Sequence, residues 1–267
     1  MLMGLVARAR RRLADLTQSR AATTWSRVPV QSLWIGPELS TLERLSLTSF
    51  VQNGHRVHLY IYDDVAGIPP GVVRRDARKI LPADRIFRYG PEAGEGEGSV
   101  AAFANVFRYK LLSDRGGWWF DTDVVCLRPL DVREPYCFAR EDETGIAIGL
   151  IKAPRNSSLM KTLYDSAVAS GTELVWADTG PTLMTRVVAG SSYERFVLPP
   201  QAVYPVSWRV PLSAFEEDPL GIVWAQLEGA YTVHLWNELL RRAGLDKNAR
   251  FPATSVFERL KRRYGFD

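Results

Sequence analysis

Cysteine and histidine are scarce in this chain. It has only two cysteines, Cys126 and Cys137, and three histidines among 267 residues. The cysteines do not form a CxxC pair, so the sequence excludes a disulfide-stapled scaffold and a zinc site built from paired cysteines. This sparse use of cysteine is typical of a reducing compartment, and we expect a cytoplasmic protein.

Long hydrophobic runs are also missing. No window approaches the roughly 18 apolar residues that a membrane-spanning helix needs. The start of the chain has apolar side chains at helical spacing with arginines between them, which predicts a basic amphipathic helix in residues 1–27 rather than a secretory signal. These arginines, together with Lys261, Arg262 and Arg263, could make peripheral contact with an anionic membrane, although basic termini are more often simply solvated. We expect no nucleic-acid partner.

The composition allows a large core, because 46% of the residues are hydrophobic and the net charge is only +4. A strand is predicted at 28–36, a helix at 40–53 and a strand at 57–62, an order that implies an α/β layer with a parallel pair. Residues 66–98 are predicted to be mostly irregular, with a flexible surface loop at Gly94–Gly98. The glutamates of this loop would repel phosphate, so a phosphate-binding role is disfavoured.

The second half continues the alternation of strands and helices. A strong helix is predicted at 99–114 from its buried apolar stripe. Short strands are predicted at 136–139, 145–150, 196–198 and 231–237, and helices at 157–170 and 181–189.

The stretch from Gly116 to Leu127 is the most informative. It is aromatic and β-branched like a buried strand, yet Asp121 and Asp123 interrupt it. In an extended backbone both carboxylates lie on one face, where leaving them unpaired would cost several kcal/mol. A cation between them would remove that cost, and adjacent hard oxygens suit Mg²⁺ or Mn²⁺. The alternative is a strand that ends at Phe120, with both aspartates solvated in a turn.

Other polar residues are expected near this stretch. Asn105, Arg108 and Leu112 share one face of the predicted helix, which a glycine turn directs toward the carboxylates. Arg108 could be a counter-charge there, or it could bind an anionic ligand. Asp178 precedes a Gly-Pro turn, and His234 lies in the last predicted strand, where a lone histidine is most often a structural hydrogen-bonding group.

Taken together, these motifs resemble a known enzyme family. Residues 117–123, preceded by Phe107-Arg108-Tyr109, resemble the DXD region of the glycosyltransferases related to yeast initiation mannosyltransferase. Thr179-Gly180-Pro181 and His234-Leu235-Trp236-Asn237 resemble the α1,4-galactosyl- and N-acetylglucosaminyltransferase branch. The resemblance covers about residues 28–240.

The resemblance implies a fold and a division of the chain. We expect an α/β, GT-A-like (Rossmann-like) fold with a mixed, mainly parallel sheet flanked by helices in a single domain. That domain spans 28–240, after the basic helix of 1–27 and before a basic helical tail at 241–267.

The resemblance also implies roles for individual residues. Asp123 would bind a metal directly, Asp121 would contact the metal and the donor ribose, and His234 would complete the metal shell. The nucleotide-sugar donor would be bordered by residues from three predicted elements, namely Trp34, Gly36, Asn105, Arg108, Tyr109 and Gly180. Two positions depart from the family pattern: Asn105 replaces an aspartate, and Gln31-Ser32-Leu33 stands where a histidine is common.

The implied activity is metal-dependent transfer of a sugar, with retention of configuration, from a nucleotide-sugar (a UDP-sugar in our prediction) to a glycan or lipid-linked acceptor. Mn²⁺ or Mg²⁺ would stabilise the leaving diphosphate. Asp178 would stabilise the oxocarbenium-like sugar or orient the acceptor, unless it merely caps a helix.

Two other interpretations of the same residues remain open. Asp121 could be the nucleophile and Asp123 the acid/base of a haloacid-dehalogenase-like phosphatase, although that motif normally opens its domain. A relic that binds a nucleotide-sugar, or a metal-dependent carbohydrate-binding module, would use the same motif without turnover.

Overall fold

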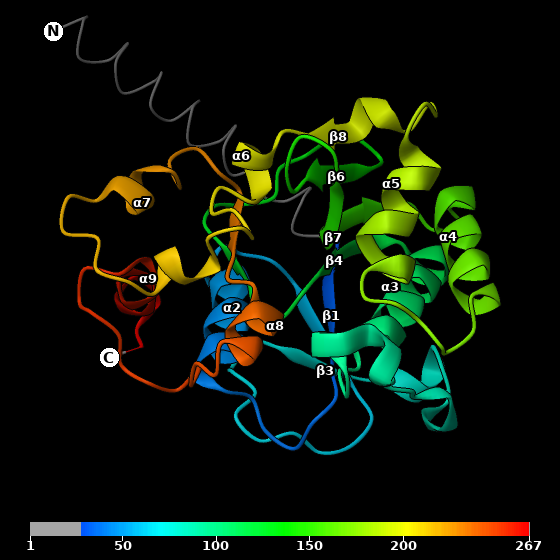
Figure 1. The fold of residues 1–267 in the computed structure, drawn as a ribbon, viewed down its shortest axis with the longest axis horizontal. Helices are drawn as coiled ribbons and strands as arrows, with labels where there is room; N and C mark the ends of the chain where they lie inside the picture. Colours follow the sequence, from blue (N-terminus) through cyan, green and yellow to red (C-terminus); the bar gives the residue numbers. More distant parts are fainter. Residues whose placement is uncertain (1–27, 267) are drawn as a thin grey trace, which may run out of the picture.

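A seven-stranded sheet forms the centre of the molecule, in the order β3-β2-β1-β4-β7-β6-β8 (Figure 1). In this order, the strands are β3 (Val73–Asp76), β2 (Val57–Ile61), β1 (Val30–Trp34), β4 (Gly117–Phe120), β7 (Ile146–Ala153), β6 (Cys137–Arg140) and β8 (Val197–Leu198). Within this sheet β7 runs antiparallel to both of its neighbours, and the other pairs are parallel. The computed structural model describes residues 28–266. The predicted mixed, mainly parallel α/β fold is confirmed.

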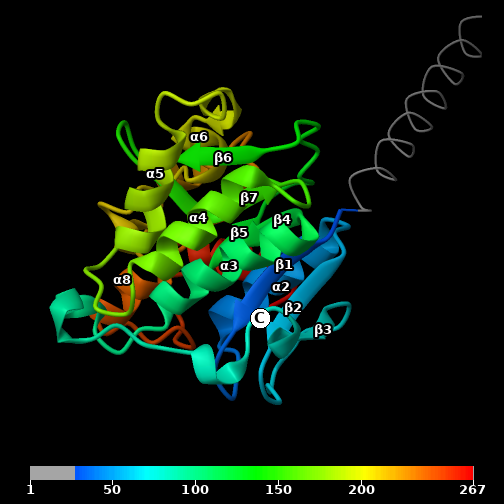
Figure 2. The ribbon, with the colours of Figure 1, turned by 90° about the vertical axis from the view of Figure 1, so that its right-hand side faces the viewer.

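Helices cover both faces of the sheet. Figure 1 shows α3 (Ala101–Arg115), α4 (Ser158–Ala169) and α5 (Leu183–Val188) on one side, and α2 (Thr41–Gln52) and α9 (Val256–Tyr264) on the other. Figure 2 looks onto the side where α3 and α4 cross the strands. Each side has its own buried apolar cluster, so the sheet is the middle layer of three.

The first strand–helix–strand unit forms as the sequence predicts. Ser40 caps α2, with its hydroxyl accepting a hydrogen bond from Leu42 N, while Glu43 accepts one from Ser40 N at 2.8 Å. This capping box satisfies amide groups that a helix start otherwise leaves unpaired. After α2 the chain returns through Gly54, which has φ +80°, to pair β2 parallel with β1.

The predicted irregular segment 66–98 is more ordered than expected. It contains β3 and three 3-10 turns: η1 (Ala77–Lys79), η2 (Ala83–Arg85) and η3 (Pro91–Gly96). The sequence of β3 is Val-Arg-Arg-Asp, which lacks apolar alternation because β3 is a largely exposed edge strand. Tyr89 and Gly98 close the Gly94–Gly98 loop at its base, where Gly98 N donates to Tyr89 O at 2.9 Å. The mobility of this loop stays a prediction.

The prediction of one continuous strand through both aspartates is wrong. β4 ends at Phe120, and Val124 N donates to Asp121 O at 2.9 Å, which closes a tight turn. The chain then leaves the main sheet as β5 (Val124–Cys126), which pairs antiparallel with β9 (Thr232–His234). The alternative is right that the strand ends at Phe120 and a turn follows, but Asp123 is not solvated there, because it is only 8% exposed.

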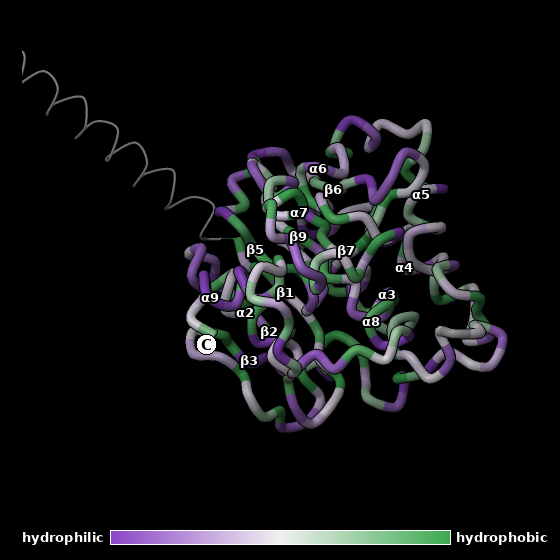
Figure 3. Tube along the Cα trace, turned by 60° about the vertical axis from the view of Figure 1, so that its left-hand side comes forward, coloured by the Kyte–Doolittle hydropathy of each residue, from purple (hydrophilic) through white to green (hydrophobic). Residues whose placement is uncertain are grey.

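The C-terminal region contributes to the core. After β9 come α8 (Asn237–Arg242) and α9, and Val256, Phe257 and Leu260 of α9 are fully buried in a cluster shared with α2. In Figure 3 hydrophobic residues (green) concentrate along the central strands and hydrophilic residues (purple) along outer helices and loops. No helix among the described residues is both long and apolar enough to cross a bilayer. The predicted amphipathic helix in 1–27 lies outside the described residues.

Candidate active site

The pairing of β5 with β9 brings His234 to the aspartate turn. Val124, directly after Asp123, lies opposite His234 in the ladder. Asp121, Asp123 and His234 each offer one ligand atom, and these atoms all lie within 4.8 Å of one another. The structure therefore brings together the three residues predicted to hold a metal.

Asp123 is held from two directions. Its Oδ2 lies 3.0 Å from His234 Nε2 and accepts a hydrogen bond from Asn237 N at 2.7 Å. Burial alone would raise the pKa of Asp123, but the charge and hydrogen bond of His234 and the Asn237 amide outweigh it and lower that pKa. Burial likewise would lower the pKa of His234, but Asp123, together with Asp121 and Glu141, raises it. Asp123 is therefore held as a carboxylate, which suits a cation.

Arg108 is the counter-charge of Asp121. Its Nη1 lies 3.1 Å from Asp121 Oδ1 and donates to Ile148 O at 2.6 Å. Trp119 Nε1 also donates to Asp121 Oδ1, at 2.7 Å, and the Arg108 guanidinium lies over the Trp119 ring. The predicted approach of the α3 face to the aspartates is confirmed, since the buried arginine contacts and orients one of the carboxylates.

Gly149 leaves room between the two sides of this cluster. A Cβ on Gly149 would lie 3.1 Å from Cε1 and 3.3 Å from Nδ1 of His234, and 3.5 Å from Asp121 Oδ2. Among the described residues, the buried His234 Nδ1 has no hydrogen-bond partner. Two carboxylates, an imidazole and a gap that only glycine leaves open are consistent with a divalent cation. The sequence signal for Gly149 was a glycine inside an otherwise apolar strand, which often marks a close approach.

Trp34 and Gly36 lie at the same edge of the sheet as Asp121. β1 pairs parallel with β4, so the residues that follow both strands emerge together. Trp34 Nε1 is buried without a partner among residues 28–266, and a Cβ on Gly36 would lie 3.2 Å from it. An unpaired buried donor at this edge is available to a ligand.

The Gly-Pro turn is hydrogen-bonded to two side chains of α3. It lies in η4 (Asp178–Thr182), a π-type turn, where Thr179 O accepts from the buried Tyr109 hydroxyl at 3.1 Å. Thr179 Oγ1 accepts from Asn105 Nδ2 at 3.2 Å, and a Cβ on Gly180 would lie 3.0 Å from that same nitrogen. Asp178 itself is exposed. Asn105 and Tyr109 thus position the turn that carries Asp178, and direct donor contact by either stays a prediction.

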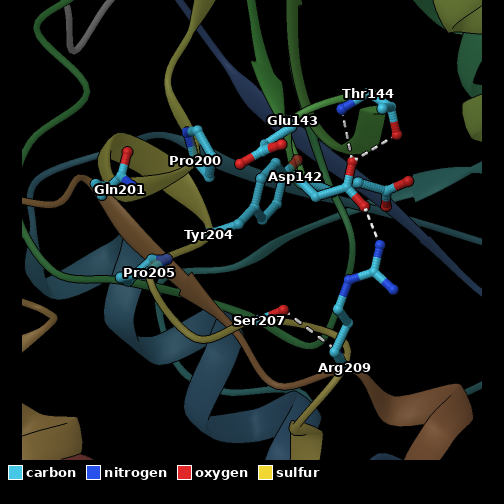
Figure 4. Close-up of a pocket in the computed structure, with 10 residues that line it drawn as sticks. Asp142, Glu143, Thr144, Pro200, Gln201, Tyr204, Pro205, Ser207 and Arg209 are labelled. Carbon is cyan, nitrogen blue, oxygen red and sulfur yellow. Dashed lines mark hydrogen bonds and ion pairs between the residues drawn. The ribbon is translucent and has the colours of Figure 1, made fainter.

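A polar pocket of about 440 Å³ adjoins the cluster and was not predicted from the sequence. Figure 4 shows Asp142 between Thr144 and Arg209, with Arg209 Nη2 2.9 Å from its carboxylate. Tyr204 links the pocket to the cluster, because its ring centroid lies 5.7 Å from that of His234. Burial and the neighbouring Asp142 raise the pKa of Glu141, a further lining residue. The pocket therefore presents two acidic groups in different environments beside His234.

Two known conserved regions match this chain. Residues 97–139 match the glycosyltransferase sugar-binding region containing the DXD motif, and residues 153–264 match the alpha 1,4-glycosyltransferase conserved region. The second match extends past the predicted domain end at 240.

Individual relatives agree with these matches. Lactosylceramide 4-alpha-galactosyltransferase of Mus musculus is 25% identical over 150 residues, which cover 52% of this chain and 42% of that protein. The Homo sapiens enzyme of the same name is 27% identical over 178 residues, which cover 62% of this chain and 48% of that protein. The chain thus spans about half the length of these two relatives. Among solved structures, PaToxG glycosyltransferase aligns with a TM-score of 0.46 at 14% identity, covering 96% of this chain and 94% of that one.

Proposed function

We propose that this chain, a DXD-containing glycosyltransferase of the α1,4-glycosyltransferase family, transfers a sugar from a UDP-sugar to a hydroxyl group of a glycan or lipid-linked acceptor, with retention of configuration. The observation that carries the proposal is the convergence of Asp121, Asp123 and His234 around the gap at Gly149. Sequence similarity places the chain in the family, and this cluster supplies the acidic centre that the reaction requires.

Asp121, Asp123 and His234 would hold Mn²⁺ or Mg²⁺. When bound, the cation supplies Lewis-acid stabilisation of the negative charge on a diphosphate leaving group. The protein prepares this site in advance, because Arg108 and Trp119 orient Asp121 while His234 and the Asn237 amide orient Asp123. Preorganised ligands need little rearrangement when charge develops in the reaction.

The donor would lie along the edge where β1 and β4 end. Trp34 would border the nucleotide base and offer its unpaired Nε1 as a donor, and Gly36 would let the backbone approach closely. Asp178 would lie near the sugar, where its exposed carboxylate stabilises positive charge or orients the acceptor. Asn105 and Tyr109 would act through the turn they hold.

The acceptor would occupy the polar pocket beside His234. Sugar hydroxyls both donate and accept hydrogen bonds, and the pocket offers carboxylates at Glu141 and Asp142, an amide at Gln201 and a guanidinium at Arg209. The pocket adjoins the metal-binding residues through Tyr204, so an acceptor there would lie close to the donor sugar.

The phosphatase interpretation is not supported. The chain is a glycosyltransferase by its family matches. In addition, Asp121, the nucleophile in the phosphatase interpretation, forms an ion pair with Arg108 and accepts a hydrogen bond from Trp119. A relic that binds the donor without turnover makes the same contacts as an enzyme, so only kinetics separates the two.

The test is hydrolysis of a set of UDP- and GDP-sugars in Mn²⁺, Mg²⁺ or EDTA, with calorimetric binding measured in parallel. We expect hydrolysis of a UDP-sugar with metal and none in EDTA. Asp123→Asn should abolish turnover, and it should also lower the free energy of unfolding because it breaks the buried pair with His234. Full activity in EDTA, or in Asp123→Asn, would refute the metal role, and tight binding without turnover would identify a relic.

A further inference from the structure

A second pocket lies along β1, β2 and β3, and none of its lining residues belongs to the aspartate cluster. Its volume is about 470 Å³, and its lining residues are Pro29, Gln31, His58, Tyr60, Arg74, Arg75, Asp76, Lys79, Ile80 and Arg115. Pro29 precedes β1, and Arg115 ends α3 just before β4 begins. The pocket therefore includes the edge where these strands start, whereas Gly36 and Asp121 follow the edge where they end. Figure 2 shows β1, β2 and β3 side by side at this end of the sheet.

The charge of this pocket is uncompensated. Four cationic side chains line it, those of Arg74, Arg75, Lys79 and Arg115, and none of them forms an ion pair within residues 28–266. Asp76 is the one carboxylate in the lining, and its Oδ1 already accepts from Arg78 N at 3.0 Å and lies 3.7 Å from Arg78 Nη1. Like charges gathered around a hollow repel one another, and a bound anion would relieve that repulsion.

The floor of the pocket is polar and hydrogen-bonded. Gln31 is 1% exposed and donates through Nε2 to Gly116 O at 2.8 Å, and the Tyr60 hydroxyl donates to Gln31 Oε1 at 3.4 Å. Arg75 Nη2 lies 3.3 Å from His58 Nε2. Burial, followed by the charges of Arg75 and Arg56, lowers the pKa of His58 to about 4. His58 is therefore neutral near pH 7, and its ring can orient Arg75 without adding charge.

We propose that this pocket binds a phosphate-bearing anion, either a soluble phosphorylated compound or the phosphorylated headgroup of a lipid. Guanidinium groups bind phosphate oxygens through paired hydrogen bonds, and the pocket offers three of them around one hollow. The proposal does not depend on the glycosyltransferase activity, because no residue of the metal cluster lines this pocket.

Inorganic pyrophosphate and vesicles test the two sources of phosphate. All measurements use the full chain in EDTA, which prevents metal-assisted binding at the aspartate cluster. Calorimetry with pyrophosphate reports the soluble source, and sedimentation with phosphatidylglycerol against phosphatidylcholine vesicles reports the lipid source. We expect the double variant Arg74→Gln/Arg115→Gln to weaken at least one of these interactions tenfold or more.

A matched control separates this site from general charge. Arg133→Gln/Arg186→Gln removes the same two charges from exposed positions outside the pocket, and it should bind like the wild-type chain. Loss of pyrophosphate binding in the pocket variant alone supports a soluble ligand, and loss of vesicle binding alone supports a lipid headgroup. Equal binding by both variants, or no binding of either probe by the wild-type chain, would overturn the proposal. Where pyrophosphate binds, it should slow hydrogen exchange at residues 73–79 in the wild-type chain and in the control variant, but not in the pocket variant.

Discussion

At the residue scale, His234 is the side chain whose role depends most on the tertiary structure. Its Nε2 contacts Asp123, its Nδ1 has no partner among the described residues, and its ring packs 4.0 Å, centroid to centroid, from Trp236. Trp236 is anchored in turn, since its Nε1 donates to Val206 O at 2.9 Å. The imidazole is thus held in place with one nitrogen still available.

We predict that His234→Ala lowers Mn²⁺-supported kcat/KM by about tenfold or more, the scale expected when a metal's ligand shell is disturbed. His234→Gln should recover little of this loss, because an amide is a weaker ligand than imidazole. The measurement is kcat/KM as a function of Mn²⁺ concentration, with Mn²⁺ affinity measured directly. If both variants keep the wild-type metal dependence, His234 only supports the fold around Asp123.

Gly149 gives a second residue-scale prediction. In Gly149→Ala the new methyl group would lie within 3.5 Å of both His234 and Asp121, in the gap where a cation is proposed. We expect metal affinity to fall at least tenfold while the unfolding transition moves little, because the neighbouring atoms need shift only slightly. Calorimetric titration with Mn²⁺ measures the first quantity and urea denaturation the second. Unchanged Mn²⁺ affinity would place the cation elsewhere.

At the element scale, the η3 turn and the segment before η4 form one unit. A Cβ on Gly96 would lie 2.4 Å from a carbon of the Trp176 ring, and that ring packs 5.2 Å, centroid to centroid, from Tyr89. Trp176 lies two residues before Asp178. Movement of the Gly94–Gly98 loop would therefore shift Trp176 and, through it, the η4 turn that carries Asp178.

We predict that UDP with Mn²⁺ protects the Gly94–Gly98 loop from proteolysis, because a loop that shields the donor becomes ordered when the donor binds. Trp176→Ala removes the partner of this loop and should reduce the protection. The rate of cleavage within 91–98 is compared with and without UDP and Mn²⁺. Identical rates in both conditions would make this an ordinary surface turn.

At the scale of the whole molecule, the pH dependence of stability depends on a buried histidine. His55 is 6% exposed, and its Nε2 accepts a hydrogen bond from Leu130 N at 3.1 Å, joining the end of α2 to the chain after β5. Burial lowers the pKa of His55 to about 4, from 6.5 in an exposed histidine. Between these two pH values the unfolded chain binds a proton that the folded chain does not.

We therefore predict that the free energy of unfolding falls as pH drops from 6.5 toward 4. His55 alone should account for a loss of about 3 kcal/mol, because each pKa unit corresponds to about 1.4 kcal/mol. Urea denaturation at pH 7.5 and pH 4 measures the difference, and His55→Gln, which cannot titrate, should show a shallower decline. An equal decline in His55→Gln would assign the effect to other groups, of which His58 is the first to consider.

The sequence by itself determined the features that local patterns encode. The order strand, helix, strand from β1 to β2 follows from hydrophobic periodicity, the Ser40 cap and the Gly54 stop, which act within a few residues. The Asp121–Asp123 pair was visible as a motif, and the helical spacing of α3 was enough to assign the face of Arg108. The order of the motifs was enough to indicate the family.

Only the tertiary structure decided how the site is assembled. The chain turns at Asp121 and continues as β5, which no local pattern required, and the partner strand β9 comes from the far end of the sequence. The gap at Gly149, the fastening of the Asp178 turn by Asn105 and both pockets depend on packing between elements distant in sequence. The physical reason is that periodicity shows which face of an element is buried, whereas the packing of the whole core selects the element it is buried against.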